Sequence, residues 1–183
     1  MRHVIRKLFF DFEKEELFLN KMSANGLALS KYTWGKYVFD EAPKGEYIYR
    51  LELLEYPMDS VESQNYIQFM EETGAELVAT YHRWAYFRKK ASEGDFNIYT
   101  DIDSRLKHYE RIRFLFLVVI GVNIFAGFFN LFLGNLHSTS SYPAINNYVG
   151  IFSFSFVTLL LISLLLPLTK KIERLKKEKQ IRE

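Results

Sequence analysis

The chain contains no cysteine, and this absence removes several kinds of chemistry at once. Disulfides, thiolate nucleophiles and cysteine-based metal sites all need the missing side chain. The sequence also lacks the phosphate-binding pattern GxxxxGKS/T, the dinucleotide-binding pattern GxGxxG and the nucleophile-elbow pattern GxSxG. We therefore expect no cofactor and no metal, and the sequence argues against an enzyme without deciding the question.

Two long segments contain no charged residue and no histidine, namely 114–133 and 148–168. Both are rich in Leu, Ile, Val and Phe, the residues that insert most favourably into lipid. A helix needs about 20 apolar residues to cross the roughly 30 Å hydrocarbon core of a bilayer. The sequence therefore predicts two transmembrane helices.

Basic residues flank the outer ends of these two segments, whereas the loop between them, 134–147, contains no Lys or Arg. Because basic residues in short loops remain on the cytoplasmic side, we predict a multi-pass cell-membrane protein with both termini in the cytoplasm. We do not expect the N-terminal stretch to be a signal peptide, since its apolar part is short and charge resumes at Asp11. The basic tail, 169–183, suits contact with anionic lipid headgroups.

Charge and hydropathy together divide the chain into six regions. The first is nearly neutral and lacks the basic character of a nucleic-acid-binding protein, so we expect no direct nucleic-acid binding. The predicted regions are a cytoplasmic α+β domain (1–98), a juxtamembrane connecting helix (99–113), transmembrane helices (114–133 and 148–168), an extracytoplasmic loop (134–147) and a basic cytoplasmic tail (169–183).

Strand-like and helix-like segments alternate in the N-terminal region. Asp11 and Asp59 are placed to cap two helices, and Thr100 a third that continues into the first transmembrane segment. A bend is expected at Gly35 within an extended segment, 27–39, and the turn at 42–45 is expected to join this segment to the next strand as a hairpin. The order of elements predicts a ferredoxin-like, split βαβ fold.

Four blocks of the sequence resemble an uncharacterised bacterial family, domain of unknown function 2812, in a membrane-anchored form. The blocks are 7–16, 45–55, 83–90 and 99–112. The resemblance covers residues 5–113. It suggests an association with neighbouring PadR-like transcriptional regulators, and hence a regulatory protein attached to a membrane. It implies no catalytic residues.

Aromatic side chains are denser in the N-terminal region than a small core requires. Together with two charged residues of a predicted strand they form a candidate face for a partner or ligand. The alternative interpretation is purely structural: the aromatic residues belong to an ordinary core, and the charged residues pair with each other on a solvent-exposed face of the sheet. The candidate residues are Tyr32, Trp34, Tyr37, Arg50, Glu52, Trp84 and Tyr86.

Small and polar residues recur on one side of the first apolar segment at Asn123, Gly127 and Asn130. In lipid such residues face another helix, and Ser155 and Thr158 in the second segment are candidate partners. The alternatives are packing within the hairpin, a homo-oligomer and a polar pathway.

Other polar residues have a simple structural explanation. Asp101 and Asp103 could bind a cation, but capping of the third helix explains them as well. The four histidines, His3, His82, His108 and His137, show no metal-ligand spacing.

These observations favour a membrane-anchored regulatory or interaction domain that signals to a cytoplasmic partner. Two alternatives remain, an accessory subunit of a membrane transporter and a small membrane-tethered enzyme. The enzyme would need Asp11, Asp101 or Asp103 to converge with Arg50 or His108.

Overall fold

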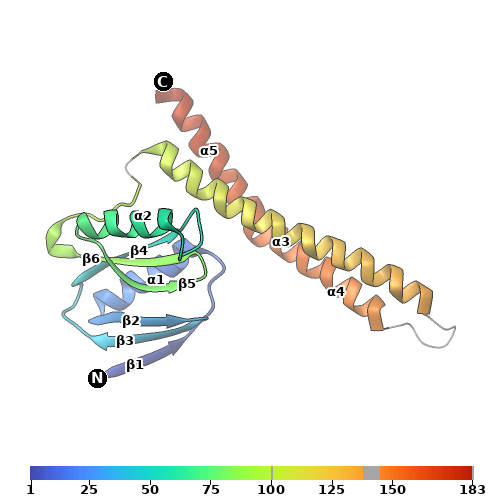
Figure 1. The fold of residues 1–183 in the computed structure, drawn as a ribbon, viewed down its shortest axis with the longest axis horizontal. Coiled ribbons are helices and arrows are strands. Elements are labelled where there is room, and N and C mark those ends of the chain that lie inside the picture. The colour runs from blue at the N-terminus through green and yellow to red at the C-terminus, as the bar shows by residue number, and fades with distance from the viewer. Residues whose placement is uncertain (100, 138–144, 183) are drawn as a thin grey trace. The chain divides into compact units, whose positions relative to one another are not determined.

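The computed structural model describes residues 1–99, 101–137 and 145–182. The chain divides into two compact units, Met1–Thr100 and Asp101–Glu183. The first combines strands with helices, and the described part of the second is helical (Figure 1). The mixed α+β class and the helical hairpin agree with the prediction. Thr100 and most of the predicted loop, 138–144, lie outside the described residues.

The first unit contains six strands in two antiparallel sheets, ordered β1-β3-β2 and β4-β6-β5. In each sheet the third strand lies between the first two, which makes each half a split βαβ motif. The elements are β1 (Arg2–Arg6), α1 (Phe12–Ala24), β2 (Leu27–Thr33), β3 (Lys36–Glu41), β4 (Tyr47–Leu53), α2 (Val61–Glu72), β5 (Glu76–Tyr81), β6 (Trp84–Lys90) and a short 3₁₀ helix, Ala91–Glu93.

Two details of the predicted connectivity are wrong. The segment 27–39 is not one bent strand but two strands, because Trp34 and Gly35 both adopt positive φ and form a two-residue hairpin turn. The turn at 42–45 does not close a hairpin, because β3 and β4 belong to different sheets. The single ferredoxin-like sheet is thus replaced by two three-stranded sheets. Helix α2 is capped by Ser60 rather than Asp59.

The two halves of this unit repeat the same structure. Thr33 pairs with Lys36 across the β2–β3 turn, and Tyr81 pairs with Trp84 across the β5–β6 turn, 48 residues further along. The register shifts after Leu29 in β2 and after Leu77 in β5, again 48 residues apart. The first unit is therefore a tandem of two βαββ repeats, which the sequence did not reveal because few residues at equivalent positions are identical.

Helix α1 joins the two repeats through a polar stripe. Its Glu16, Asn20 and Ser23 side chains hydrogen-bond the backbone of β4 along the edge that does not pair with β6. Asn20 Oδ1 accepts from the Tyr49 N–H at 2.8 Å, and Asn20 Nδ2 donates to the Tyr49 carbonyl at 3.1 Å. These side chains take the place of a neighbouring strand, so the edge of the sheet is not left unsatisfied.

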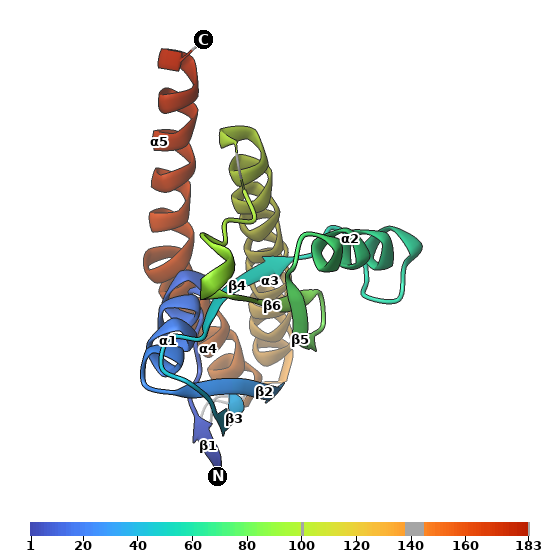
Figure 2. The same ribbon diagram turned by 90° about the vertical axis from the view of Figure 1, so that its left-hand side faces the viewer.

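Two apolar cores hold the first unit together. Helices α1 and α2 lie on opposite sides of the β4-β6-β5 sheet (Figure 1, Figure 2). The core on the α1 side consists of Leu19, Leu29, Tyr37, Phe39, Tyr49, Leu51 and Tyr86. The core on the α2 side consists of Leu54, Ile67, Met70, Ala75, Ala85, Phe87 and Phe96.

The second unit begins with one long helix, α3 (Ile102–His137), which contains both the connecting segment and the first apolar segment. The returning chain forms α4 (Ile145–Leu160), a π-helical turn at Leu161–Leu165 and α5 (Leu166–Arg182). The π turn comes just before Pro167, whose missing N–H interrupts the regular hydrogen-bond pattern.

Ile102–Leu136 and Ile145–Ile181 are long and apolar enough to cross a membrane. In the most apolar 18-residue stretch of each helix, only 11% and 22% respectively is buried within the protein. The core helix of a soluble domain would be mostly buried. Two such helices fit a membrane-spanning protein whose apolar side chains contact lipid.

Candidate functional site

The seven residues predicted to form a binding face do not share one surface. Tyr37 and Tyr86 are buried in the core on the α1 side, and Tyr32 and Trp84 pack against it. Trp34 lies at the tip of the β2–β3 turn with 71% of its surface exposed. Four of the predicted residues therefore come together, but in the interior.

Arg50 and Glu52 do not form an exposed charge ladder. Glu52 is buried, and it accepts a hydrogen bond from the hydroxyl of Tyr99, which follows β6 in the chain. Arg50 donates to the Tyr49 carbonyl at 2.8 Å and reaches Asn97 Oδ1 at 3.5 Å. Both side chains thus hold the segment after β6 against β4.

Two of the predicted aromatic residues, Tyr37 and Tyr86, bind a buried carboxylate, that of Glu15. Glu15 Oε1 accepts hydrogen bonds from the Tyr37 hydroxyl at 2.6 Å and from the Tyr86 hydroxyl at 2.8 Å. The Tyr32 ring lies 4.8 Å from that of Tyr37 and 4.7 Å from that of Tyr86. Because Tyr37 lies on β3 and Tyr86 on β6, this carboxylate connects the two repeats.

Burial raises the pKa of Glu15 above its usual value, and the hydrogen bonds from the two tyrosines oppose that rise. Burial, together with the nearby Glu15, raises the pKa of both Tyr37 and Tyr86. The tyrosines therefore remain neutral hydrogen-bond donors. The spacing of Phe12, Leu19 and Met22 places position 15 on the inner face of α1, and this was the signal in the sequence that could have identified Glu15.

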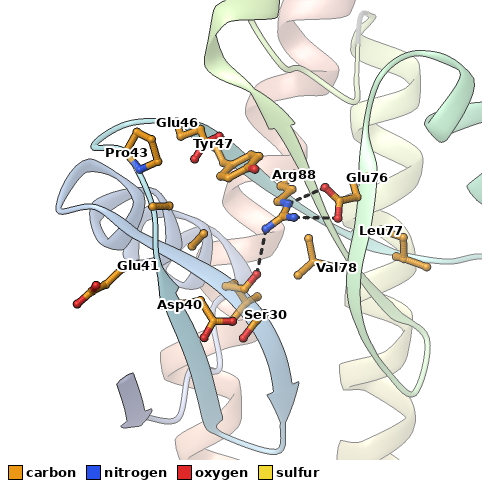
Figure 3. Close-up of a pocket in the computed structure, with 13 residues that line it drawn as sticks. Ser30, Asp40, Glu41, Pro43, Glu46, Tyr47, Glu76, Leu77, Val78 and Arg88 are labelled. Atoms are coloured by element: carbon orange, nitrogen blue, oxygen red, sulfur yellow. Dashed lines mark hydrogen bonds and ion pairs between the residues drawn. The ribbon is translucent and has the colours of Figure 1, made fainter. Parts of the chain in front are cut away.

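A pocket opens between the edges of β2 and β5, where the two sheets diverge (Figure 3). We call it the wedge pocket. Its volume is about 430 Å³, within the range of small-molecule sites. Its lining comes from both repeats: Ala28, Leu29, Ser30, Asp40, Glu41, Ala42, Pro43, Glu46, Tyr47, Glu76, Leu77, Val78 and Arg88.

Arg88 is the central side chain of the wedge pocket. Its guanidinium donates two hydrogen bonds of 2.8 Å to Glu76 on β5 and one of 3.3 Å to the Leu29 carbonyl on β2 (Figure 3). It also lies 4.2 Å from the centre of the Tyr47 ring. Arg88 is largely buried whereas Glu76 is 58% exposed, so Glu76 is the partner that a ligand can displace.

Carboxylates outnumber basic groups in the wedge pocket. Hydrogen bonds from Ser30 and Arg2 lower the pKa of Asp40, and the N-terminal amine lowers that of Glu41. Both groups are therefore ionised at neutral pH. With Glu46 and Glu76 they give the lining of the wedge pocket four carboxylates against the single guanidinium of Arg88. This charge pattern suits a cationic or zwitterionic ligand, with an aromatic ring and backbone carbonyls for further contacts.

The predicted helix-packing residues separate into two groups. Gly127 faces α4, because a Cβ there would lie 3.0 Å from the Phe154 ring, and Gly150 of α4 packs close to the Gly127 carbonyl. Ser155 and Thr158 are exposed instead, and each donates to the carbonyl four residues earlier in its own helix. Asn123 and Asn130 make the same type of intrahelical hydrogen bond.

The basic tail is paired with acidic residues of α3. Lys176 Nζ lies 2.7 Å from Glu110, and Lys179 Nζ lies 2.8 Å from Asp103. The tail therefore packs as a helix beside the start of α3, and the two helices form a pair that extends beyond the apolar part of the hairpin. Contact with lipid would be in addition to this pairing.

The carboxylates considered for an enzyme have local structural roles. Asp11 caps α1, Asp101 accepts from the Ser104 N–H at 2.7 Å, and Asp103 pairs with Lys179. Within 1–99, 101–137 and 145–182, no group of three or more His, Asp or Glu side chains is arranged to hold a metal ion.

Comparison with known proteins places the chain in a family. Neither a curated protein nor a solved structure matches it. The sequence model of a family described as "Protein of unknown function (DUF2812)" matches residues 11–120, which is more than half of the chain and includes most of both βαββ repeats. The chain therefore belongs to the DUF2812 family.

Proposed function

We propose that this protein is a bacterial two-span membrane protein whose N-terminal domain is cytoplasmic and acts as a regulatory binding domain. The observation that carries the proposal is the wedge pocket, in which Arg88 connects the two repeats of a domain that precedes a membrane hairpin. A ligand in the pocket competes for the groups that hold the repeats together. Binding there is therefore coupled to the relative position of the repeats.

The distribution of basic residues supports the orientation. Arg105, Lys107, Arg111 and Arg113 precede the apolar part of α3, and the tail carries seven more Lys and Arg residues, whereas the connecting loop has none. The exit from the domain also suits a mechanical role. Helix α3 runs from Ile102 into the apolar segment as one element, so a movement imposed on its N-terminal end can be passed on as a tilt or rotation.

The regulatory partner that we propose is a PadR-like transcriptional regulator, as the family resemblance suggests. An accessory subunit of a transporter is the second candidate, and the exposed Ser155 and Thr158 of α4 favour it, since they leave a polar contact surface on the hairpin. The small membrane-tethered enzyme is the weakest candidate, because Asp11, Asp101 and Asp103 are already used in capping and pairing.

The absence of cysteine makes the orientation directly testable. We expect a membrane-impermeant maleimide, applied to intact cells, to label a single cysteine at Ser140 and not one at Lys44 or Gln180. Permeabilised cells should show labelling at all three positions, which controls for reactivity. Labelling of the Lys44 variant in intact cells would place the N-terminal domain outside and contradict the proposal.

The partner is testable in the full-length protein with a photo-crosslinking amino acid at Ser30, an exposed residue of the wedge pocket. Asn65, an exposed residue of α2 on the far side of the second sheet, is the matched control position. We expect a transcriptional regulator to be captured from Ser30 and not from Asn65. Capture of a transporter subunit would favour the second candidate. Equal capture from both positions would show that the partner does not bind specifically at the wedge pocket.

A further inference from the structure

The turn between β2 and β3 presents an unusual residue to solvent. Trp34 adopts φ 25°, in the region that favours Gly and Asn, and yet its large apolar side chain is 71% exposed. A bulky aromatic residue in this conformation adds backbone strain and gains little from burial in the fold. Contact with a surface outside the domain explains why Trp34 occupies this position.

The strand register gathers basic residues around Trp34. Arg6 at the end of β1 lies opposite Lys36 at the start of β3, and Lys31 lies two residues before the end of β2. The Lys7 N–H donates to the Gly35 carbonyl at 2.7 Å, which brings Leu8 beside the turn with 59% of its surface exposed. We call this surface, made of Arg6, Lys7, Leu8, Lys31, Trp34 and Lys36, the apical patch.

Positive charge dominates the apical patch. In the part of the chain that the structure describes, Arg6, Lys31 and Lys36 take part in no ion pair, and Lys7 lies over the rings of Phe9 and Phe18. The carboxylates of the same sheet, Asp40 and Glu41, stand at the opposite end of β3. The nearest carboxylate along the chain, Asp11, caps α1 and lies 3.8 Å from Lys14.

We propose that the apical patch docks on the surface of a bilayer that contains anionic phospholipid. Trp is the side chain most suited to the headgroup region, where its ring is half in lipid and its N–H reaches water. Basic residues next to it are attracted by the negative surface of the leaflet. The domain is tethered to this partner, because only residues 91–101 separate the end of β6 at Lys90 from the start of α3 at Ile102, the helix that continues into the apolar segment.

Docking gives the N-terminal domain two states, one with its β2–β3 turn on the lipid surface and one released from it. The inference rests on the proposed membrane anchoring but not on its orientation, because it concerns the lipid headgroups of whichever leaflet the domain faces. It is also independent of ligand binding in the wedge pocket, because the lining of that pocket shares no residue with the apical patch.

The test uses the full-length protein, one copy per nanodisc, with a nitroxide spin label on a single cysteine. Lys36→Cys places the label in the apical patch, and Lys44→Cys places it on the same type of exposed residue beyond the other end of β3. In discs of phosphatidylserine and phosphatidylcholine we expect the label at position 36 to collide with a water-soluble nickel chelate several-fold less often than the label at position 44. In phosphatidylcholine alone this difference should shrink.

Two further variants separate docking from misfolding. Trp34→Asn should abolish the protection at position 36 while the domain stays folded, because Asn is favoured at positive φ. Arg6→Gln and Lys31→Gln should each lower the ratio of docked to released domain about fivefold, the effect of removing one basic residue from a lipid surface.

Equal collision rates at positions 36 and 44 in the phosphatidylserine discs would overturn the inference. Protection at position 36 that is the same in both lipids and persists in Trp34→Asn would also overturn it, since this would indicate contact with the protein itself. Because both leaflets of the disc carry the same lipid, a wrong orientation leaves this result unchanged. Failure of docking can therefore be told apart from failure of the proposed function.

Discussion

Replacing Glu15 with alanine is expected to destabilise the N-terminal domain by about 3 to 5 kcal/mol. The substitution leaves the hydroxyls of Tyr37 and Tyr86 without their acceptor and opens a cavity between the two repeats. The measurement is urea unfolding of the full-length protein in detergent micelles, followed by tryptophan fluorescence. Trp84 packs against this core, with its ring 5.8 Å from that of Phe12, and so reports the unfolding of this domain.

Two variants control this prediction. Glu15→Gln keeps an oxygen acceptor and stays neutral, and because burial already raises the pKa of Glu15, the glutamine variant should lie within about 1 kcal/mol of wild type. Lys21→Ala, an exposed substitution on the same helix, should change stability by about 0.5 kcal/mol or less. An alanine variant as stable as the glutamine variant would show that Glu15 does not hold the repeats together.

The second large effect is a loss of stability as pH rises, caused by Glu16. Burial raises the pKa of Glu16 from 4.5 to about 7, while the hydrogen bond from the Leu51 N–H and the charge of Arg50 oppose the rise. At a pH between 4.5 and about 7, Glu16 therefore holds its proton in the folded domain but loses it in the unfolded chain. The stabilising contribution is therefore complete below pH 4.5 and is lost as pH rises through about 7, with a size of up to about 3 kcal/mol.

We expect Glu16→Gln to flatten this pH dependence, because Gln cannot ionise and its side-chain oxygen can still accept from the Leu51 N–H. Urea midpoints of both proteins, measured between about pH 5 and pH 8, provide the comparison. Burial also raises the pKa of Glu15, but this residue is present in both proteins, so the difference between the two curves reports Glu16. The pKa values of Asp40 and Glu41 are lowered instead, so these groups do not add to the effect. Parallel curves for wild type and variant would contradict the assignment of the effect to Glu16.

Several features of the fold followed from short stretches of sequence. The N-cap at Asp11 depends only on neighbouring residues, and it agrees with the structure. The two apolar helices were equally clear, because length and hydropathy are properties of a continuous segment. The β2–β3 turn was harder to recognise, since Trp is an uncommon residue at positive φ and Gly35 alone suggested only a bend.

The candidate site depends on contacts that no local pattern in the sequence shows. Aromatic density drew attention to Tyr32, Tyr37, Trp84 and Tyr86, which belong to or pack against one core, but not to the buried carboxylate that Tyr37 and Tyr86 bind. Glu15 in the first turn of a helix is typical of a favourable contact with the helix dipole, and this local explanation hid its other role. The hydrogen bond from Tyr86 to Glu15 joins residues 71 positions apart, beyond any local pattern.

The sequence by itself determined the family, the mixed α+β class, the two membrane-compatible helices and the absence of cysteine chemistry. Each of these depends on composition or on a contiguous stretch of residues. Only the tertiary structure decided that the strands form two βαββ repeats, that Glu15 and Arg88 connect them, and that Trp34 stands exposed among basic residues. These features arise from pairing between strands distant in the chain, and such pairing is decided by the packing of the whole domain.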